Sequence, residues 1–162
     1  MAVEKALEKV LDTAVNNIDL TVTNRKEFTI NGDPTKVLRL NTSDLSMVTR
    51  LNALYPKLQK LAREALGSFD IDESEDVETF IAKTSESLMN IDTQMRKLID
   101  ELFDANVSEM CAPEGTMYDP IDGKLRFEYI IETLSRLYER DLKAEVEKTT
   151  AHISKYTDKY TQ

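Results

Sequence analysis

The residues most able to carry out chemistry in this chain are Cys111 and His152, its only cysteine and only histidine. A thiol becomes a catalytic nucleophile when an imidazole takes its proton and a third group orients that imidazole. Here the polar end of the last predicted helix, which carries His152, would have to fold back onto the loop that holds Cys111. A surface histidine and a half-buried small thiol are the commoner arrangement. We therefore expect no enzyme activity and no catalytic residues.

Metal-binding patterns are incomplete in the sequence. A zinc shell needs more cysteine and histidine side chains than the single one of each present here. Asp70 and Asp72 begin like a calcium-binding loop, but Glu75 stands where the sharp turn requires glycine. Ile81 occupies the place of the bidentate carboxylate that completes such a loop. The sequence thus predicts no metal site.

Phosphate-binding and acid–base patterns are also missing. Gly123-Lys124 is followed by Leu125 rather than serine or threonine, and Tyr118 occupies the place of the earlier glycine of a Walker loop. Four scattered glycines cannot form a dinucleotide-binding fingerprint. Acidic residues are abundant on predicted exposed helix faces, where carboxylates are usually solvated and keep ordinary pKa values. No cofactor is expected.

The composition limits the kinds of partner. The chain has 162 residues, enough for one domain, with 21 basic and 30 acidic residues and a net charge of −9. This charge repels nucleic-acid phosphates and anionic lipids, so neither nucleic acid nor a membrane is an expected partner. No apolar run approaches the ~20 residues of a membrane span, and the charged start MAVEKALEKV is unlike a signal peptide. A single unpaired cysteine suits a reducing compartment, so we expect a cytoplasmic protein.

The first part of the chain predicts a helix, a small sheet and a second helix. Apolar residues at helical spacing predict a helix over residues 1–18. Residues 20–41 contain β-branched and aromatic residues separated by turn clusters, which predict two or three short antiparallel strands. Residues 43–67 predict a long helix, and Pro56 inside it predicts a kink or a break there.

The clearest helical pattern covers residues 74–104. Its apolar residues alternate steps of four and three, as in a helix that packs almost antiparallel to another in a bundle. These residues are Val77, Ile81, Thr84, Leu88, Ile91, Met95, Leu98 and Leu102. The predicted fold is therefore mainly α (α+β): a single domain over 1–162, a bundle of three to four helices with a small N-terminal antiparallel β-hairpin or two- to three-stranded sheet.

The last helix is predicted over residues 125–160 and changes character along its length. Its apolar face is broad up to Leu142. Beyond that residue it narrows to a single line of positions, which are separated alternately by four and three residues. The narrow part consists of Val146, Thr149, Ile153, Tyr156 and Tyr160. A helix this polar gains little by packing on its own core, so its end either projects and orders against a partner or frays as a tail.

Residues 106–123 predict one elaborate loop between the last two helices. Prolines and glycines mark its turns, and the apolar side chains between them indicate an ordered segment. Two interpretations stay open for these apolar residues: closure of the core, or an exposed docking patch. The candidate partner-binding residues, in this loop and in the last helix, are Met110, Met117, Tyr118, Ile121, Ile153, Tyr156 and Tyr160.

Two segments resemble a known protein family. KVLRLNTSDLSMVTRLNALYPKL is similar to the strand, cap and helix of tail assembly chaperones of long-tailed phages and prophages of Gram-positive bacteria. IDTQMRKLIDELFDANVSEMCAPEGTMYDPIDGKLRFEYIIETL resembles the later part of that family, where a helix leads to a turn-rich loop, a "GK" and a closing helix. The first helix and the segment after Leu142 have no counterpart in that pattern, which leaves the oligomeric state open, self-association included.

The resemblance implies a non-enzymatic protein of the host bacterial cytoplasm. Such a chaperone shields the long helical tape measure protein while tail tube subunits polymerise around it, so its partners are the tape measure protein and the tail tube protein. An acidic helical protein with an apolar groove suits this role, because it can cover sticky helices with its own apolar faces.

Two other functions stay open. One is an acidic phage-encoded inhibitor that mimics nucleic acid, for which the carboxylates would have to gather on one surface; lysines and arginines are instead interspersed along the same predicted helices. The other is a minor structural tail or connector protein of the virion.

Overall fold

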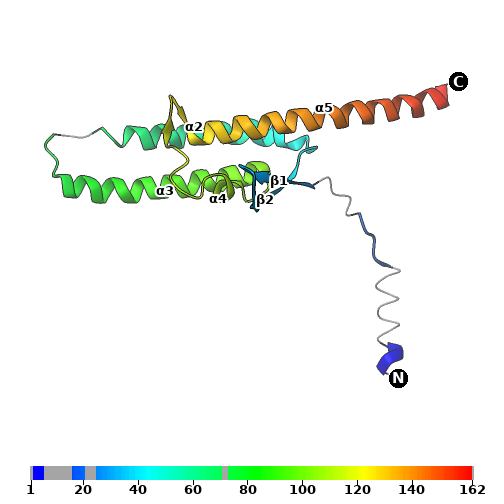
Figure 1. Cartoon of the computed structure of the whole chain (residues 1–162), viewed down its shortest axis with the longest axis horizontal. Coiled ribbons are helices and arrows are strands. Elements are labelled where there is room, and N and C mark those ends of the chain that lie inside the picture. The colour runs from blue at the N-terminus through cyan, green and yellow to red at the C-terminus, as the bar shows by residue number, and fades with distance from the viewer. Residues whose placement is uncertain (1, 6–15, 21–24, 71–72, 162) are drawn as a thin grey trace.

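The computed structural model describes residues 2–5, 16–20, 25–70 and 73–161. It is mainly helical with a small antiparallel hairpin, which confirms the predicted fold class (Figure 1). The elements are β1 (Arg25–Ile30), β2 (Asp33–Asn41), α2 (Ser46–Gly67), α3 (Val77–Phe103), α4 (Val107–Cys111), β3 (Pro120–Ile121), β4 (Lys124–Leu125) and α5 (Arg126–Thr161). Of the helix predicted over 1–18, residues 2–5 and 16 are helical and residues 6–15 lie outside the described residues.

Strands β1 and β2 form an antiparallel hairpin around an Asn-Gly turn. Asn31 and Gly32 both have positive φ, at 53° and 72°, as the tight two-residue turn of a hairpin requires. Phe28 pairs with Leu38 in the register, and Leu38 and Leu40 point into the core because alternate residues of a strand face the same side. Of the predicted strand region, residues 21–24 lie outside the described residues.

Helix α2 runs unbroken through Pro56, so the break that the sequence allowed there does not occur. Proline removes a hydrogen bond to the carbonyl four residues earlier, here that of Asn52. Both Pro56 and Asn52 are exposed, so water can bind the freed carbonyl and the helix continues. Helix α3 packs along α2, with its buried residues confined to the stretch from Ile91 to Phe103.

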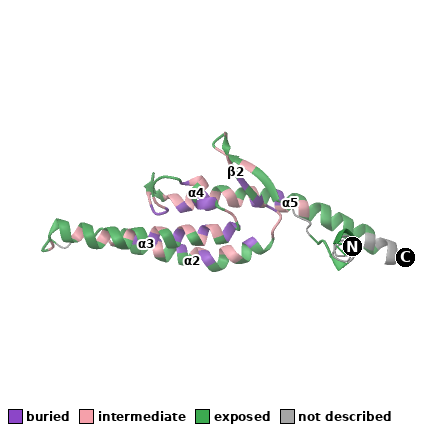
Figure 2. Cartoon of the chain, turned by 90° about the horizontal axis from the view of Figure 1, so that it is seen from below, coloured by how far each residue is buried: buried purple, intermediate pink, exposed green. Residues whose placement is uncertain are grey.

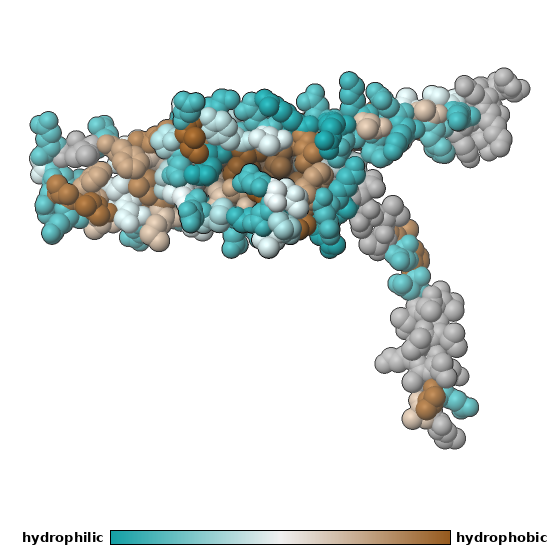
Figure 3. Space-filling model, in the orientation of Figure 1, coloured by the Kyte–Doolittle hydropathy of each residue, from teal (hydrophilic) through white to brown (hydrophobic). Residues whose placement is uncertain are grey.

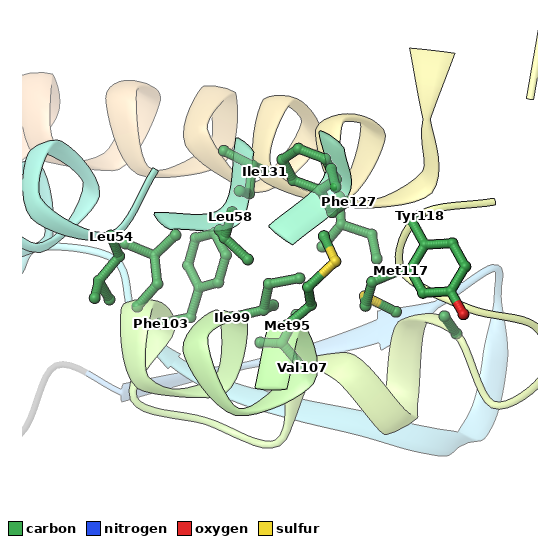
Figure 4. Packing of buried hydrophobic residues seen from close by; sticks show 14 of the residues in the cluster. Leu54, Leu58, Met95, Ile99, Phe103, Val107, Met117, Tyr118, Phe127 and Ile131 are labelled. Carbon is green, nitrogen blue, oxygen red and sulfur yellow. The ribbon is translucent and has the colours of Figure 1, made fainter. Parts of the chain in front are cut away.

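The first half of α5 closes the core over α2 and α3 (Figure 4). Aromatic rings of different helices pack against each other. The ring centroids of Phe103 in α3 and Tyr138 in α5 are 5.8 Å apart, and those of Tyr55 in α2 and Phe127 in α5 are 6.1 Å apart. The hairpin is joined to α5 through Asp141, whose buried carboxylate accepts hydrogen bonds from other elements. The fold thus has one core, shared by α2, α3, α4, β2 and the first half of α5.

The second half of α5 extends away from this core (Figures 1 and 2). Leu142 is the last residue of α5 that packs against the core cluster. From Lys143 to Lys155 every residue is exposed except Glu145, which is half-buried. The structure therefore continues the helix well beyond the part that the core can stabilise.

Candidate protein-binding surfaces

The loop after α4 is held by side chains of α3 rather than by regular secondary structure. Arg96 donates hydrogen bonds to the carbonyl oxygen of Ser108 in α4 (3.2 Å) and to the loop carbonyl oxygens of Ala112 (2.9 Å) and Gly115 (2.9 Å). Its Nε also donates to Asp92 Oδ2 at 2.8 Å, and Asp92 Oδ1 accepts from the Met117 amide at 2.7 Å. Because a guanidinium can donate in several directions at once, Arg96 alone joins α3 to the end of α4 and to the first part of the loop.

Of the four loop residues proposed from sequence as partner contacts, Met117 and Tyr118 are buried and Met110 is half-buried. Met117 is fully buried and Met110 is half-buried against the core, so both serve core closure, the other interpretation of the loop. Tyr118 is also buried, with its hydroxyl donating to the Leu88 carbonyl oxygen at 3.0 Å. Ile121, in the small β3–β4 hairpin, is 40% exposed and remains accessible to a partner.

Cys111 and His152 occupy different parts of the molecule. Cys111 ends α4 beside the core, whereas His152 is exposed on the projecting half of α5. Burial raises the pKa of the Cys111 thiol to about 11, and the charge of Asp100 adds to this rise. The thiol is therefore protonated at neutral pH, which is the opposite of what a nucleophilic cysteine needs.

The first three turns of α3 form an uncovered apolar face. Residues 77–88, which we call the α3 overhang, continue the same apolar stripe that packs on α2 further along the helix. No residue of the overhang is buried: Val77 is 68% exposed and Ile81 is 58% exposed (Figure 2). The cause lies in α2, which ends at Gly67 and provides no helix opposite the start of α3.

A hollow of about 360 Å³ lies at the base of the overhang. Exposed Met89 of α3 and exposed Phe69 after α2 stand at its edge, and the buried Tyr118 ring contributes to its lining. Its other apolar lining residues are Phe80, Ile81 and Leu88. Figure 3 shows hydrophobic side chains gathered at this end of the molecule. Tyr118, proposed from sequence as a loop contact, thus lies where the loop meets this surface.

The same end carries most of the net negative charge of the chain. Residues 70–90 contain seven acidic residues and one lysine, so they hold six of the nine net negative charges. Glu75 pairs with Lys83 at 3.0 Å, and that lysine is the only base in the segment. An apolar stripe bordered by carboxylates suits an apolar partner with basic flanks.

A second, larger groove separates the β1–β2 hairpin from α5. It has a volume of about 830 Å³, and Cys111 and Ile121 lie along it. Its apolar floor comes from Phe28, Ile30, Leu38, Leu40, Ile130, Leu134 and Leu137, and its basic rim from Arg126, Arg136 and Arg140. The groove is open to solvent along α5, and each of its three arginines pairs with a carboxylate, that of Asp119, Glu132 or Asp141.

The narrow apolar stripe of α5 is the third uncovered face. Val146 is 46% exposed and Ile153 is 57% exposed on the projecting half of the helix. Tyr156 and Tyr160, the other two candidates from the sequence, belong to the helix, but their side chains lie outside the described residues.

Sequence reasoning missed the α3 overhang, because it placed the whole stripe from Val77 to Leu102 inside the bundle. The sequence contained a signal for this: the preceding helical pattern ends at Gly67, and the acidic segment after it does not continue a helical apolar stripe that could cover the start of the next helix.

In the described residues, no group of three or more metal-ligating side chains lies together. Over the same residues, no helix is long and apolar enough to cross a bilayer.

Comparison of the chain with family models, with curated proteins and with solved structures yields no match. The surfaces described above are therefore the basis for assigning a function.

Proposed function

We propose that this chain is a phage tail assembly chaperone that binds an amphipathic helix of the tape measure protein and performs no chemistry. The single observation that carries the proposal is the α3 overhang, an apolar helical stripe on which Val77 and Ile81 are exposed in the described structure. Shielding an aggregation-prone helix requires such a face, whereas catalysis requires reactive groups in a cleft.

The spacing of the overhang favours a helix as its occupant. Its residues follow the same steps of four and three as the part of α3 that packs on α2. Twelve residues of helix span about 18 Å, which is enough for three turns of a partner helix. A helix laid there would continue the packing that α2 begins, with ridges of one helix in the grooves of the other.

The charge of the same end favours a basic occupant and disfavours a second copy of the overhang. Two overhangs face to face would bring twelve net negative charges together, since each copy has six over residues 70–90. Like charges across an interface suppress association, whereas a helix with lysines or arginines beside its apolar face gains attraction and a faster encounter. An interaction of this kind weakens as salt is added, which suits a chaperone that must leave before the tail is complete.

The test is co-expression with fragments of the tape measure protein, followed by affinity purification. Ile81→Lys places a cation at the centre of the overhang, and we expect it to weaken capture of the fragment by roughly tenfold or more. Leu45→Lys is the matched control, because Leu45 is an equally exposed apolar residue at the start of α2. Absence of any complex with tape measure fragments, or equal capture by the Ile81→Lys variant, would contradict the proposal.

A nucleic-acid mimic is the second candidate, and the acidic tip is the observation in its favour. Along the other helices some carboxylates pair with bases, as in Asp92–Arg96 (2.8 Å) and Glu132–Arg136 (3.0 Å), which offsets part of the negative charge there. The two functions separate by mutation. A mimic depends on the carboxylates of residues 70–78 and should tolerate Ile81→Ser, which leaves the charge unchanged, whereas the chaperone depends on the apolar side chain of Ile81.

A structural component of the virion is distinguished by mass spectrometry of purified particles. A chaperone is absent from mature particles, whereas a tail or connector protein is present at a fixed copy number.

A further inference from the structure

We propose that the projecting half of α5 pairs with the same segment of a second copy, as an antiparallel two-stranded coiled coil. This inference concerns a different surface from the α3 overhang and does not depend on the chaperone function.

The projecting helix needs a stabilising partner. Residues 143–161 form about five turns of helix beyond the last contact with the core. Isolated helices of this length are marginal in water, because each residue ordered adds only a small gain. Val146 and Ile153 remain about half exposed, so apolar surface is available for a second helix to cover.

The spacing of the stripe gives the pairing a register. From Leu142 onward its residues alternate steps of four and three, which are the core positions of a heptad pattern. When two copies run antiparallel about a two-fold axis at Ala151, Thr149 lies opposite Ile153 and the register stays in phase. The same symmetry sets Val146 opposite position 156 and Leu142 opposite position 160. Every core position over the projecting length then meets a core position of the other copy.

The charges beside the stripe favour this antiparallel orientation. In the heptad, Glu145, His152 and Lys159 take equivalent flanking positions along one side of the stripe. Antiparallel pairing sets Glu145 of each copy opposite Lys159 of the other, and it brings the two His152 positions together at the axis. Parallel pairing sets Glu145 opposite Thr150 and so forms neither pair. Within one chain, Glu145 Oε1 lies 3.8 Å from Lys148 Nζ, which is a long contact for an ion pair.

The net charge of the whole molecule favours the same orientation. Residues 143–161 contain four lysines and three acidic residues, so this segment is slightly positive while the rest of the chain has a net charge of −10. A parallel coil would hold two such acidic bundles side by side. An antiparallel coil places them at opposite ends, about 28 Å apart along the helix, well beyond the ~8 Å Debye length at physiological salt.

The first experiment measures self-association by sedimentation of the full chain over a range of concentrations. We expect a reversible dimer. Ile153→Glu should raise its dissociation constant roughly tenfold or more, because it places a charge in the stripe. Ser154→Glu is the control, since the neighbouring residue is exposed and lies off the stripe. A chain that stays monomeric at about 100 µM, or that dimerises equally well with Ile153→Glu, would overturn the proposal.

The second experiment determines orientation by disulfide cross-linking in a Cys111→Ser background. Antiparallel pairing predicts that the His152→Cys variant cross-links to itself, because position 152 lies beside the axis. It predicts that Val146→Cys alone does not cross-link, but does so when mixed with Tyr156→Cys. In a parallel coil every core position faces itself, so self-cross-linking of Val146→Cys with none from His152→Cys would refute the antiparallel arrangement.

Discussion

At the scale of single residues, the loop between α4 and α5 depends on Gly115, where neither the backbone conformation nor the neighbouring atoms leave room for a side chain. Its φ is 78°, in the region that favours glycine, and its carbonyl oxygen accepts from Arg96. A Cβ at this residue would collide with Asp119 Oδ2 and lie 3.2 Å from Arg126 Nη2. Asp119 is itself fixed, because its carboxylate accepts from the amide and hydroxyl of Thr116.

Gly115→Ala should therefore destabilise the protein more than Gly32→Ala. Both glycines have similar positive φ, which costs about 1 kcal/mol for alanine at either site. Only Gly115 lacks room for a methyl group, since nothing lies within 4 Å of a Cβ at Gly32. Overpacking adds about 1–3 kcal/mol, so we expect Gly115→Ala to lower the free energy of unfolding by about 3 kcal/mol. Equal losses for the two variants in urea titrations would show that the loop adapts.

At the scale of elements, Asp141 joins the β1–β2 hairpin to α5. Its buried carboxylate accepts from the Thr42 hydroxyl at 2.5 Å and lies 3.4 Å from Lys26 Nζ. The hydrogen bond from Thr42 is the main cause that lowers the pKa of Asp141, with Arg140 and Lys26 adding to it and burial opposing it. The ionised form of Asp141 is thus preferred in the folded state.

Thr42→Val should remove part of the stability of this joint in a pH-dependent way. A carboxylate whose pKa is lowered on folding contributes fully above its ordinary value of 3.8, and loses the contribution as pH falls through the lower folded value. We expect a loss of about 2 kcal/mol at pH 7 that shrinks below pH ~4. Urea unfolding at pH 7 and pH 3 measures both.

Thr35→Val is the control for this pH dependence. Thr35 Oγ1 donates to Asp33 Oδ1 at 2.7 Å, which is the same chemistry at the exposed start of β2. Solvent screens the Thr35–Asp33 pair, so Thr35→Val should lower the free energy of unfolding by less than Thr42→Val does. A Thr42→Val effect that does not change with pH would mean that packing, rather than the charge of Asp141, holds the hairpin to α5.

At the scale of the whole molecule, a central core carries two uncovered extensions. The α3 overhang leaves it at one end and the projecting half of α5 at the other (Figure 1). Neither extension contributes a buried residue to the core: the buried part of α3 starts at Ile91, and the packed part of α5 ends at Leu142. Both extensions therefore contribute little to the packing of the core.

Removal of residues 144–162 should leave the core folded. Because Leu142 is retained, we expect the free energy of unfolding to change by less than about 1 kcal/mol, a shift of roughly 2–4 °C in Tm. Thermal circular dichroism at low micromolar concentration measures this shift. Loss of a cooperative transition in the shortened chain would show instead that the projecting helix belongs to the folding unit.

Most of the helical fold could be predicted from local patterns. The stripe in α3, the Asn31-Gly32 turn and the broad face of α5 each arise from spacing along the chain, which sequence reports directly. The roles of the loop residues could not be predicted, because Met117 and Tyr118 are buried by contacts with Asp92 and Leu88, some 25 to 30 residues away. The continuation of α2 through Pro56 could not be predicted either, because it depends on the exposure of this residue to solvent, which the local sequence does not give.

By itself the sequence determined the helical class, the hairpin and the lack of a complete catalytic or metal-binding motif, because these depend on residue type and on separations of a few positions. Only the tertiary structure decided which apolar stripes are covered. The same spacing buries Ile91, Met95 and Leu102, whereas Val77 and Ile81 are exposed and Leu88 is only half-buried, and the difference is the helix that lies opposite. The physical reason is that burial depends on where a neighbouring element ends in space, which no residue of the stripe records.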